Sequence, residues 1–512
     1  MSQISVNNLT FYYEGSYDNI FEDVSFQIDT DWKLGFIARN GKGKTTFLKL
    51  LMGQYEYRGS ISSSVVFDYF PFEIRDKDKA TIDIIEEIDP DYEFWKLCRE
   101  FTYLKMDTEI FYRSFSTLSN GEQTRVLLAL LFSRENHFLL IDEPTNHLDM
   151  ETREVLSAYL NTKKGFILVS HDRNFMDNCV NHVLVINRAS IEVQQGNFSS
   201  WQENKKKRDA CELAENERLK KDIRRLTESA RKAGQWADNV EATKIGAKSE
   251  KYEKSIDTRA YVGEKSRRMQ MRRKNIERRR QKEIEEKSGL LKNLETVEDL
   301  KIIPLKHYKE KLVVMEDCTI AYAGARRDGD TSTKDGSRKE IITHFNFEVR
   351  QGERIFLKGK NGCGKSSIIK AILQQENPVI TDGKMELPNE MIISYCAQDT
   401  SMLHGTVWDY AAENGIDETL FLAVLRKLDF SRIQFEKRIE DYSGGQKKKV
   451  LIAGSLCKRA HLYIWDEPLN FIDVFSRMQI EELILKFKPT MILVEHDKAF
   501  MENVATRVVE IR

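Results

Sequence analysis

Two long parts of the chain show the same alternation of apolar and polar positions. Short runs rich in β-branched residues alternate with segments of helical periodicity, first over residues 1–200 and again over residues 301–512. Strands separated by helices favour a mainly parallel sheet with helices on its faces. The pattern therefore predicts an α/β fold in both parts, each part forming one domain.

The two parts repeat each other at a nearly constant distance, and we call them the first and the second repeat. The landmarks that recur in the same order are Lys44 and Lys365, Asp142 and Asp466, and His171 and His496. Such similarity over a whole domain indicates a tandem duplication. A hydrophilic stretch at 326–339 occurs in the second repeat, where we expect a surface loop without an assigned function.

Residues 201–300, between the two repeats, follow a different pattern. This segment is dense in charge and nearly free of proline, and its apolar positions from Leu219 to Ala233 alternate four and three apart. That spacing is typical of a coiled coil. After a break over about 234–263, a basic helical pattern resumes, so we expect an antiparallel two-helix linker with its tip near residues 236–261.

Each repeat contains a glycine-rich turn between an apolar strand and a helix, typical of a phosphate-binding loop (P-loop). Glycines let consecutive backbone N–H groups surround phosphate oxygens, and the N-terminus of the next helix favours the same charge. The candidate phosphate-binding residues are Ala38, Arg39, Asn40, Gly41, Lys42, Gly43, Lys44, Thr45 and Thr46 in the first repeat, and Gly359, Lys360, Asn361, Gly362, Cys363, Gly364, Lys365, Ser366 and Ser367 in the second.

Roles inside these loops follow from the pattern. Lys44 and Lys365 are expected to reach the β- and γ-phosphates of a nucleotide, while Thr45 and Ser366 offer hydroxyl groups to Mg²⁺. Ala38 replaces the first glycine of the pattern, a change to a small residue that we expect the turn to tolerate.

An apolar strand that ends in two acidic residues occurs once in each repeat. The sequences HFLLIDE and LYIWDE place Asp142, Glu143, Asp466 and Glu467 at strand ends. In doubly wound sheets, ligands bind at the carboxyl edge of the strands. We therefore expect the two aspartates to hold Mg²⁺ and the two glutamates to orient or deprotonate the attacking water as catalytic residues.

A serine–glycine motif leads a helix shortly before each acidic strand. Its residues are Ser119, Asn120 and Gly121 in the first repeat, and Ser443, Gly444 and Gly445 in the second. Such a helix N-terminus can accept an anion, and the alternative is that the serine is a plain helix cap. The position just before the acidic strand favours the anion-binding interpretation.

Two further residue types recur at matching places. Another apolar strand of each repeat ends in a histidine, His171 or His496, and we expect both to sense the γ-phosphate, although a structural role is the alternative. Tyr13 and Tyr322 lie near the beginning of the repeats. Either tyrosine can stack on adenine, and the alternative is a buried strand tyrosine.

Composition separates the linker from the repeats. The whole chain has a net charge of −1, yet residues 201–290 contain 27 Lys and Arg against 17 Asp and Glu. A basic helical segment can neutralise RNA phosphates, and the alternative is a solvated coiled-coil spacer.

The remaining compositional features bear on location. No run of roughly 18 apolar residues is present, and the N-terminus has no secretory signal. Seven scattered cysteines without a C-x-x-C pair favour reduced thiols. We therefore expect a cytoplasmic protein without membrane segments.

The ordered set of motifs resembles the nucleotide-binding domains of the ATP-binding cassette (ABC) superfamily over nearly the whole chain. The resemblance implies ATP and Mg²⁺ as cofactors, ATP hydrolysis, and two cassettes that pair head to tail within one monomer. It also implies one site built from Lys44, Thr45, Asp142, Glu143, His171, Ser443, Gly444 and Gly445, and another built from Lys365, Ser366, Gln398, Asp466, Glu467, His496, Ser119, Asn120 and Gly121. In this assignment Gln398 contacts Mg²⁺.

Two fused cassettes with a basic linker and no membrane helices resemble the ABC-F group of ribosome-directed ATPases. The linker sequence and the LYIWDEPLNFIDVF run are similar to the branch that protects against lincosamide, streptogramin A and pleuromutilin antibiotics. The resemblance implies binding to the 70S ribosome at the tRNA exit site, where the linker approaches 23S rRNA and the P-site tRNA. The linker tip would reach toward the peptidyl-transferase centre, and bound drug would leave.

The first repeat departs from the family pattern. Phe72 stands where Gln398 of the second repeat supplies an amide, and Asn120 replaces the first glycine of the serine–glycine motif. Phenylalanine cannot coordinate Mg²⁺, so we expect the site on Lys44 to hydrolyse ATP more slowly. Two functional alternatives are a housekeeping ABC-F translation factor and the ATPase subunit of an efflux transporter.

Overall fold

The computed structural model describes residues 2–13, 19–72, 74–134, 137–146, 148–187, 190–242, 302–322, 339–360, 362–375 and 378–511, and single positions at 268, 271, 274, 278, 279 and 282. The chain divides into two compact units. The first unit is Met1–Trp201 with Glu298–Arg512, so it contains both repeats, and the second is Gln202–Val297. Each unit is described by itself.

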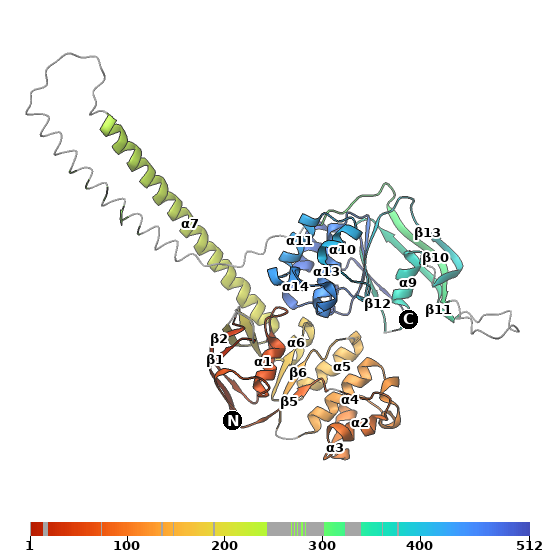
Figure 1. The fold of residues 1–512 in the computed structure, drawn as a ribbon. Helices are drawn as coiled ribbons and strands as arrows, with labels where there is room; N and C mark the ends of the chain where they lie inside the picture. The colour runs from red at the N-terminus through yellow and green to blue at the C-terminus, as the bar shows by residue number, and fades with distance from the viewer. Residues whose placement is uncertain are drawn as a thin grey trace, which may run out of the picture. The chain divides into compact units, whose positions relative to one another are not determined.

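The first repeat folds around a six-stranded sheet in the order β5-β6-β7-β3-β8-β9, of which β5 and β6 are labelled in Figure 1. Its strands are β3 (Lys33–Ile37), β5 (Val66–Phe70), β6 (His137–Asp142), β7 (Phe166–Val169), β8 (His182–Asn187) and β9 (Ser190–Gln195). Within this sheet, the described strand pairs are parallel except for β8 and β9, which pair antiparallel. A separate antiparallel sheet has the order β2-β1-β4, with β1 (Gln3–Phe11), β2 (Phe21–Asp29) and β4 (Arg58–Ser62).

The described helices of the first repeat lie between its strands along the chain. They are α1 (Lys44–Leu51), α2 (Thr81–Ile88), α3 (Phe94–Tyr103), α4 (Asn120–Ser133), α5 (Met150–Asn161) and α6 (Arg173–Cys179), with 3₁₀ turns at Thr108–Tyr112 and Phe115–Thr117. Side chains of Ser119, Asp149 and Asp172 each accept a hydrogen bond from a backbone N–H of the first helical turn. Such caps satisfy donors that a helix leaves unpaired.

The second repeat has the same arrangement. Its parallel sheet has the order β14-β15-β16-β12-β17, with β12 (Arg354–Lys358), β14 (Ile393–Cys396), β15 (Leu462–Asp466), β16 (Met491–Val494) and β17 (Arg507–Glu510). Its antiparallel sheet has the order β11-β10-β13, with β10 (Lys311–Tyr322), β11 (Lys339–Arg350) and β13 (Val379–Glu386). The predicted duplication of an α/β domain is therefore confirmed.

Helices of the second repeat follow the order of the first. They are α9 (Lys365–Ile372), α10 (Val407–Glu413), α11 (Glu418–Lys427), α12 (Arg432–Phe435), α13 (Gly444–Cys457), α14 (Val474–Phe487) and α15 (Lys498–Val504), with a 3₁₀ turn at Ile439–Asp441. The hydrophilic stretch at 326–339 lies almost wholly outside the described residues, which resume at 339.

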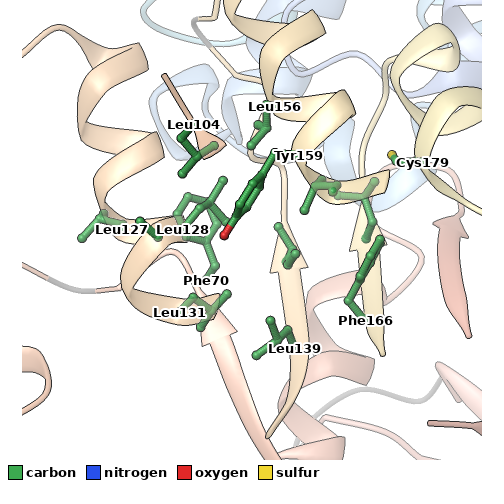
Figure 2. Close-up of a cluster of buried hydrophobic side chains, with 14 of the residues drawn as sticks. Phe70, Leu104, Leu127, Leu128, Leu131, Leu139, Leu156, Tyr159, Phe166 and Cys179 are labelled. Carbon is green, nitrogen blue, oxygen red and sulfur yellow. The ribbon is translucent and has the colours of Figure 1, made fainter. Parts of the chain in front are cut away.

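Buried side chains fill the space between each sheet and its helices. Figure 2 shows part of the largest cluster of the first repeat, where Leu127 and Leu128 of α4 and Tyr159 of α5 lie over Leu139 of β6 and Phe166 of β7. All five side chains are almost fully buried. This packing fixes the helices on the sheet and so determines where the strand ends lie.

The predicted functional motifs meet at one edge of each parallel sheet. In the first repeat, the P-loop follows β3, the acidic pair ends β6, and the histidine follows β7, and these three strands are neighbours. Strands β12, β15 and β16 do the same in the second repeat. Because parallel strands end at the same edge, side chains far apart in sequence converge there.

The linker begins as one long helix, α7 (Phe198–Ala242) (Figure 1). Leu219, Ile223 and Leu226 are half-buried among mostly exposed neighbours, as the heptad pattern predicts. The helix continues past Gly234, so the break that the sequence placed there begins later, since one glycine costs a helix only about 1 kcal/mol. The predicted tip at 236–261 lies outside the described residues from 243 onward. The rest of the linker up to 301 also lies outside them, except for the six single positions named above.

None of the described helices combines the length and the apolar composition that a membrane-spanning helix requires.

Candidate functional site: two P-loop sites

In both P-loops, the residue directly before the helix is a glycine with a left-handed backbone conformation. Gly43 and Gly364 precede α1 and α9 with φ of 91° and 101°. A Cβ atom on Gly43 would lie 2.6 Å from Ile20, and one on Gly364 would lie 2.7 Å from Ile342. Only glycine fits these positions, and the following backbone N–H groups remain available to phosphate oxygens.

Ala38, at the beginning of the first loop, is buried and its φ lies outside the left-handed region. Its counterpart Gly359 has no room for a side chain, because a Cβ there would meet Cys363 Sγ at 2.5 Å. The first loop carries Lys42 at the position of Cys363. The replacement of glycine by alanine is therefore compatible with the first loop.

The first site is built around Lys44. Its Nζ lies 3.3 Å from the carbonyl oxygen of Ala38, 3.4 Å from Asn40 Oδ1 and 2.9 Å from His171 Nε2. Burial lowers the pKa of Lys44, although the carboxylates of Glu143 and Asp142 partly offset it. An anion beside this buried lysine would stabilise its charged form, which fits a phosphate-binding role.

Asp142 is held by two hydroxyl groups in the first site. Thr45 Oγ1 donates to Asp142 Oδ2 at 2.9 Å, and Tyr69 OH donates to the same oxygen at 3.1 Å. Burial raises the pKa of Asp142, and these two hydrogen bonds oppose that rise. The threonine hydroxyl and the carboxylate therefore lie together, as a shared Mg²⁺ ligand set requires.

Glu143 and His171, the two residues predicted to be catalytic in the first site, lie side by side. His171 Nε2 lies 3.1 Å from Glu143 Oε1. Burial and the charge of Lys44 hold the pKa of His171 well below its ordinary value, so the ring is neutral and Nε2 accepts from Lys44. Burial raises the pKa of Glu143 to about 7. This carboxyl is therefore only partly ionised near neutral pH.

Lys365 occupies the corresponding place in the second site. Its Nζ donates to the carbonyl oxygens of Gly359 at 2.7 Å and Lys360 at 2.8 Å. Ser366 is hydrogen-bonded to Asp466, whose pKa is nevertheless raised by burial. The pairing of hydroxyl and carboxylate seen in the first site thus recurs here.

Glu467 accepts side-chain hydrogen bonds that its counterpart Glu143 lacks among the contacts described. Its Oε2 accepts from the amides of Gln398 and Asn470, both at 2.8 Å, and His496 Nε2 lies 3.4 Å from its Oε1. Burial alone would raise the pKa of Glu467, but His496, Lys365 and Gln398 together hold it below its ordinary value. Glu467 is therefore fully ionised at neutral pH.

Phe72 takes no part in holding Glu143. Strands β5 and β14 pair with β6 and β15 in the same register, so Phe72 and Gln398 are equivalent positions. The Phe72 ring instead packs against the hydrophobic core and lies 5.6 Å from the Arg134 guanidinium. The first site thus lacks the amide that contacts the glutamate of the second.

The serine–glycine motifs cap their helices. Ser119 and Glu122 form a reciprocal capping box at the beginning of α4, and Ser443 and Gln446 form one at the beginning of α13. The alternative that these serines are helix caps is therefore correct, and it is compatible with an anion at the same helix end.

Two repeats meet at the first site, within the first compact unit. Asn40 Nδ2 donates to the carbonyl oxygen of Phe471 at 2.7 Å, and a Cβ on Gly445 would lie 2.8 Å from that Nδ2. The structure thus brings the serine–glycine motif of the second repeat beside the first P-loop, as predicted from head-to-tail pairing.

On the other side, Lys360 Nζ of the second P-loop pairs with Glu151 Oε2 of α5 at 2.9 Å. A cavity of about 280 Å³ lies here, and its lining includes Asp149, Gly359 and His496. Gly121 belongs to the same region, because a Cβ on it would lie 3.4 Å from Thr152 of α5. The predicted residue Asn361 lies outside the described residues.

Tyr13 and Tyr322 both contact the hydroxyl residue that follows the predicted Mg²⁺ ligand. Tyr13 OH lies 2.8 Å from Thr46 Oγ1, and Tyr322 OH lies 3.3 Å from Ser367 Oγ. Tyr13 is 41% exposed, so it is not a buried strand tyrosine. An exposed ring anchored beside the P-loop is suited to stacking on a nucleobase.

Sequence reasoning missed several residues that support these sites. They are Tyr69, Asn470 and the buried arginines Arg153 and Arg477, which pair with Asp172 at 2.7 Å and Asp497 at 3.2 Å. Tyr69 recurs as Tyr395, and Arg153 as Arg477, at the spacing of the repeat. Systematic comparison of the two repeats would have found them.

Unpartnered buried atoms show that both sites fit a bound Mg²⁺–nucleotide. Among the described residues, His171 Nδ1 in the first site and Asp466 Oδ1 in the second are buried without a hydrogen-bond partner. Such atoms are expected where a ligand completes the network. Hydroxyl and carboxylate oxygens are ligands that Mg²⁺ prefers. When bound, Mg²⁺–ATP supplies the γ-phosphate for transfer to water.

Comparisons with known proteins agree with this site. The family described as ABC transporter matches residues 21–146 and 342–470. The ATP-binding protein Uup of Buchnera aphidicola is 26% identical over 99% of this chain and 80% of its own length. The energy-dependent translational throttle protein EttA of Haemophilus influenzae is 24% identical over 96% of this chain and 89% of its own.

A third relative is the ribosome protection protein VmlR of Bacillus subtilis, which is 25% identical over 96% of this chain and 84% of its own length. Among solved structures, an archaeal ribosome recycling factor aABCE1, in complex with the stalk protein aP1, aligns with a TM-score of 0.61 and 19% identity over 98% of this chain and 87% of that chain. That likeness supports the fold alone. The chain therefore belongs to the ABC-F family and is an ATPase built from two tandem ABC domains.

Proposed function

We propose that this ATPase binds the ribosome at the tRNA exit site and protects the peptidyl-transferase centre from lincosamide, streptogramin A and pleuromutilin antibiotics. In this proposal, ATP holds the two repeats together on the 70S particle. The linker then extends toward 23S rRNA and the P-site tRNA and promotes release of bound drug. Protein and ribosome meet in the cytoplasm.

The observation that carries the proposal is a cation-rich linker rooted in a two-site ATPase, with 27 Lys and Arg against 17 Asp and Glu over residues 201–290. Helix α7 continues from the first repeat, and its exposed cations include Lys206, Lys207, Arg218, Lys220, Lys221, Arg224 and Arg225. Some of them have local partners, such as Arg224 with Glu228 at 3.1 Å. Exposed pairs of this kind are weak, so the cations remain able to neutralise RNA phosphates.

The relatives also support a ribosome as the partner. EttA is described as a translational throttle and VmlR as a ribosome protection protein, and each aligns with 96% of this chain. Both descriptions apply to those proteins, and they make a ribosome the expected partner here. The efflux-subunit alternative lacks such support, because a basic helical linker has no evident role in a transporter.

Site chemistry explains how ATP would control binding. Residues of the first P-loop contact the second repeat through Asn40 and Phe471, so a nucleotide there would be enclosed by both repeats. In this proposal Glu143 and Glu467 orient the attacking water, and hydrolysis removes the γ-phosphate that joins the two surfaces. ATP binding would therefore favour the ribosome-bound state, and hydrolysis would favour release.

A pull-down tests the partner directly. The double variant Glu143→Gln, Glu467→Gln should retain ATP and sediment with 70S ribosomes, whereas the same protein without nucleotide should remain in the supernatant. Binding should weaken as salt rises, because phosphate contacts release counterions. Absence of the ATP-locked protein from the ribosome fraction would contradict the proposal.

Antibiotic susceptibility separates protection from a housekeeping role. Overproduction of the wild-type chain in a sensitive bacterium should raise resistance to a lincosamide or a pleuromutilin, and the double glutamine variant should not. A translation factor without a protective role would change growth but leave drug susceptibility unchanged. Co-purification with a membrane protein in place of ribosomes would favour the transporter alternative.

A further inference from the structure

Phe475 lies where the first P-loop meets the root of the linker helix. It is the second residue of α14, whose capping residue is Asp473. The guanidinium carbon of Arg39 lies 5.6 Å from the centre of the Phe475 ring. On another side, the Trp201 ring packs edge-on against Phe475, with centroids 5.9 Å apart. One aromatic side chain therefore contacts both a nucleotide loop and the first turn of α7.

Arg39 is fixed by its surroundings. Its guanidinium forms an ion pair with Asp429 of the second repeat, and only 16% of the Arg39 side chain is exposed. A planar guanidinium held over an aromatic ring is attracted by the π-electrons, more strongly where water is excluded. Arg39 immediately precedes Asn40, which itself bonds to the second repeat. A displacement of the P-loop at Arg39 would therefore also displace its contact with the Phe475 ring.

The root of the linker helix is part of the hydrophobic core. Phe198 and Trp201 are 1% and 4% exposed, and they belong to the same buried cluster as Val474 of the second repeat. Phe475 and Met478 pack against that cluster. Close packing transmits displacement because the interior has few voids. Movement of α14 would therefore move the first turn of α7.

The equivalent contact at the second site is different in kind. At the spacing of the repeat, Lys360 corresponds to Arg39 and Glu151 corresponds to Phe475. Their side chains form a 2.9 Å ion pair and are 76% and 70% exposed. An exposed pair is screened by water and salt and holds neighbouring elements weakly. The buried aromatic connection is thus a feature of the first site.

We propose that Phe475 is a positioning residue that couples nucleotide binding at Lys44 to the packing of Trp201, and so to the root of the linker helix. Nucleotide in the first site moves Arg39 and α14 together, and Trp201 follows. Coupling is reciprocal, so a change at Trp201 alters the ATP affinity of the first site by the same factor. The biological meaning of this coupling rests on the proposed function, but its test needs no ribosome.

Tryptophan emission provides the test. The full chain with Glu143→Gln and Glu467→Gln is titrated with Mg²⁺–ATP, and the same titration of a Trp201→Phe variant is subtracted to isolate Trp201. A nucleotide-dependent change in Trp201 emission is expected, and Lys44→Ala should abolish it. Phe475→Leu should also abolish it and shift the first-site ATP titration by about fivefold or more.

Conservative variants separate coupling from simple loss of structure. Phe475→Tyr keeps the ring and should keep the Trp201 signal, whereas Arg39→Lys keeps the charge without the planar contact and should weaken it at saturating ATP. Glu151→Gln, at the equivalent position near the second site, should leave the signal unchanged. The proposal is overturned if ATP does not alter Trp201 emission, or if the signal survives Phe475→Leu. Ribosome sedimentation would be unaffected by that failure, so the proposed function would stand.

Discussion

The two P-loop sites share their lysine and their strand-end aspartate, but they hold the glutamates that follow β6 and β15 differently. In the second site, amide groups of Gln398 and Asn470 donate to Glu467, and its pKa is lowered. In the first site, Phe72 occupies the glutamine position and burial raises the pKa of Glu143 to about 7. The two repeats thus share the lysine and the aspartate of the site, whereas the hydrogen bonds to the neighbouring glutamate differ between them.

The largest expected effect concerns the two glutamates themselves. Glu467→Gln should lower single-turnover ATP hydrolysis by about 10²–10⁴-fold, the usual contribution of a general base. Glu143→Gln should remove much less of the total activity, because Glu143 is only partly ionised near pH 7. Equal losses in the two variants, measured with the same nucleotide occupancy, would refute the predicted asymmetry.

A second difference lies beside the two histidines. The first repeat has Ser170, which lies 3.1 Å from Thr145, whereas the second has Glu495, whose Oε1 accepts from the backbone N–H of Leu469 at 2.7 Å. Glu495 is 6% exposed, and burial raises its pKa from 4.5 to about 7. The folded state therefore prefers the protonated acid, and this residue destabilises the fold as the pH rises from about 4.5 to about 7.

Glu495→Gln should remove that pH dependence. The variant should gain stability relative to wild type as the pH rises through this window, reaching about 3 kcal/mol above pH 7 and no advantage below pH 4.5. Urea unfolding at pH 5, 6, 7 and 8 measures the difference. Ser170→Ala, the matched change in the first repeat, should show no such pH dependence. A constant difference between Glu495→Gln and wild type would contradict the prediction.

Motif spacing was enough to predict the duplicated α/β fold, because P-loop glycines and strand-end carboxylates have few alternative uses. Lys44, Asp142 and His171 indeed converge at one sheet edge. Sequence did not predict Tyr69 or Phe475, because their roles depend on which side chains the packing brings beside them. A tyrosine on a strand is usually structural, and only its 3.1 Å contact with Asp142 shows otherwise.

An exchange of Gln398 and Phe72 between the two sites should change the hydrolysis rate by an intermediate amount. Gln398→Phe removes a hydrogen bond to the ionised Glu467, so second-site hydrolysis should fall by about tenfold to a hundredfold. Phe72→Gln should not restore the first site to the rate of the second, because the Phe72 side chain packs in the core near Arg134. Each site is measured separately by single-turnover hydrolysis. The second site is measured in a chain that carries Glu143→Gln, and the first site in a chain that carries Glu467→Gln. A full gain in Phe72→Gln would show that the amide alone causes the asymmetry.

The smallest expected effect concerns the tyrosines that precede these positions. Tyr69 donates a hydrogen bond to Asp142 and remains protonated, because burial raises its pKa. Burial and the charge of Asp466 also raise the pKa of Tyr395. Among the contacts described, however, Tyr395 has no corresponding hydrogen bond to Asp466. Tyr69→Phe removes about 1 kcal/mol of support from the aspartate and should weaken Mn²⁺ binding at the first site by about fivefold, measured by electron paramagnetic resonance with ATP present. Tyr395→Phe is the matched control and should change Mn²⁺ affinity less, because Asp466 keeps its contact with Ser366. Equal effects of the two substitutions would mean that both tyrosines only fill space, and that the hydroxyl of Tyr69 does not position the metal ligand.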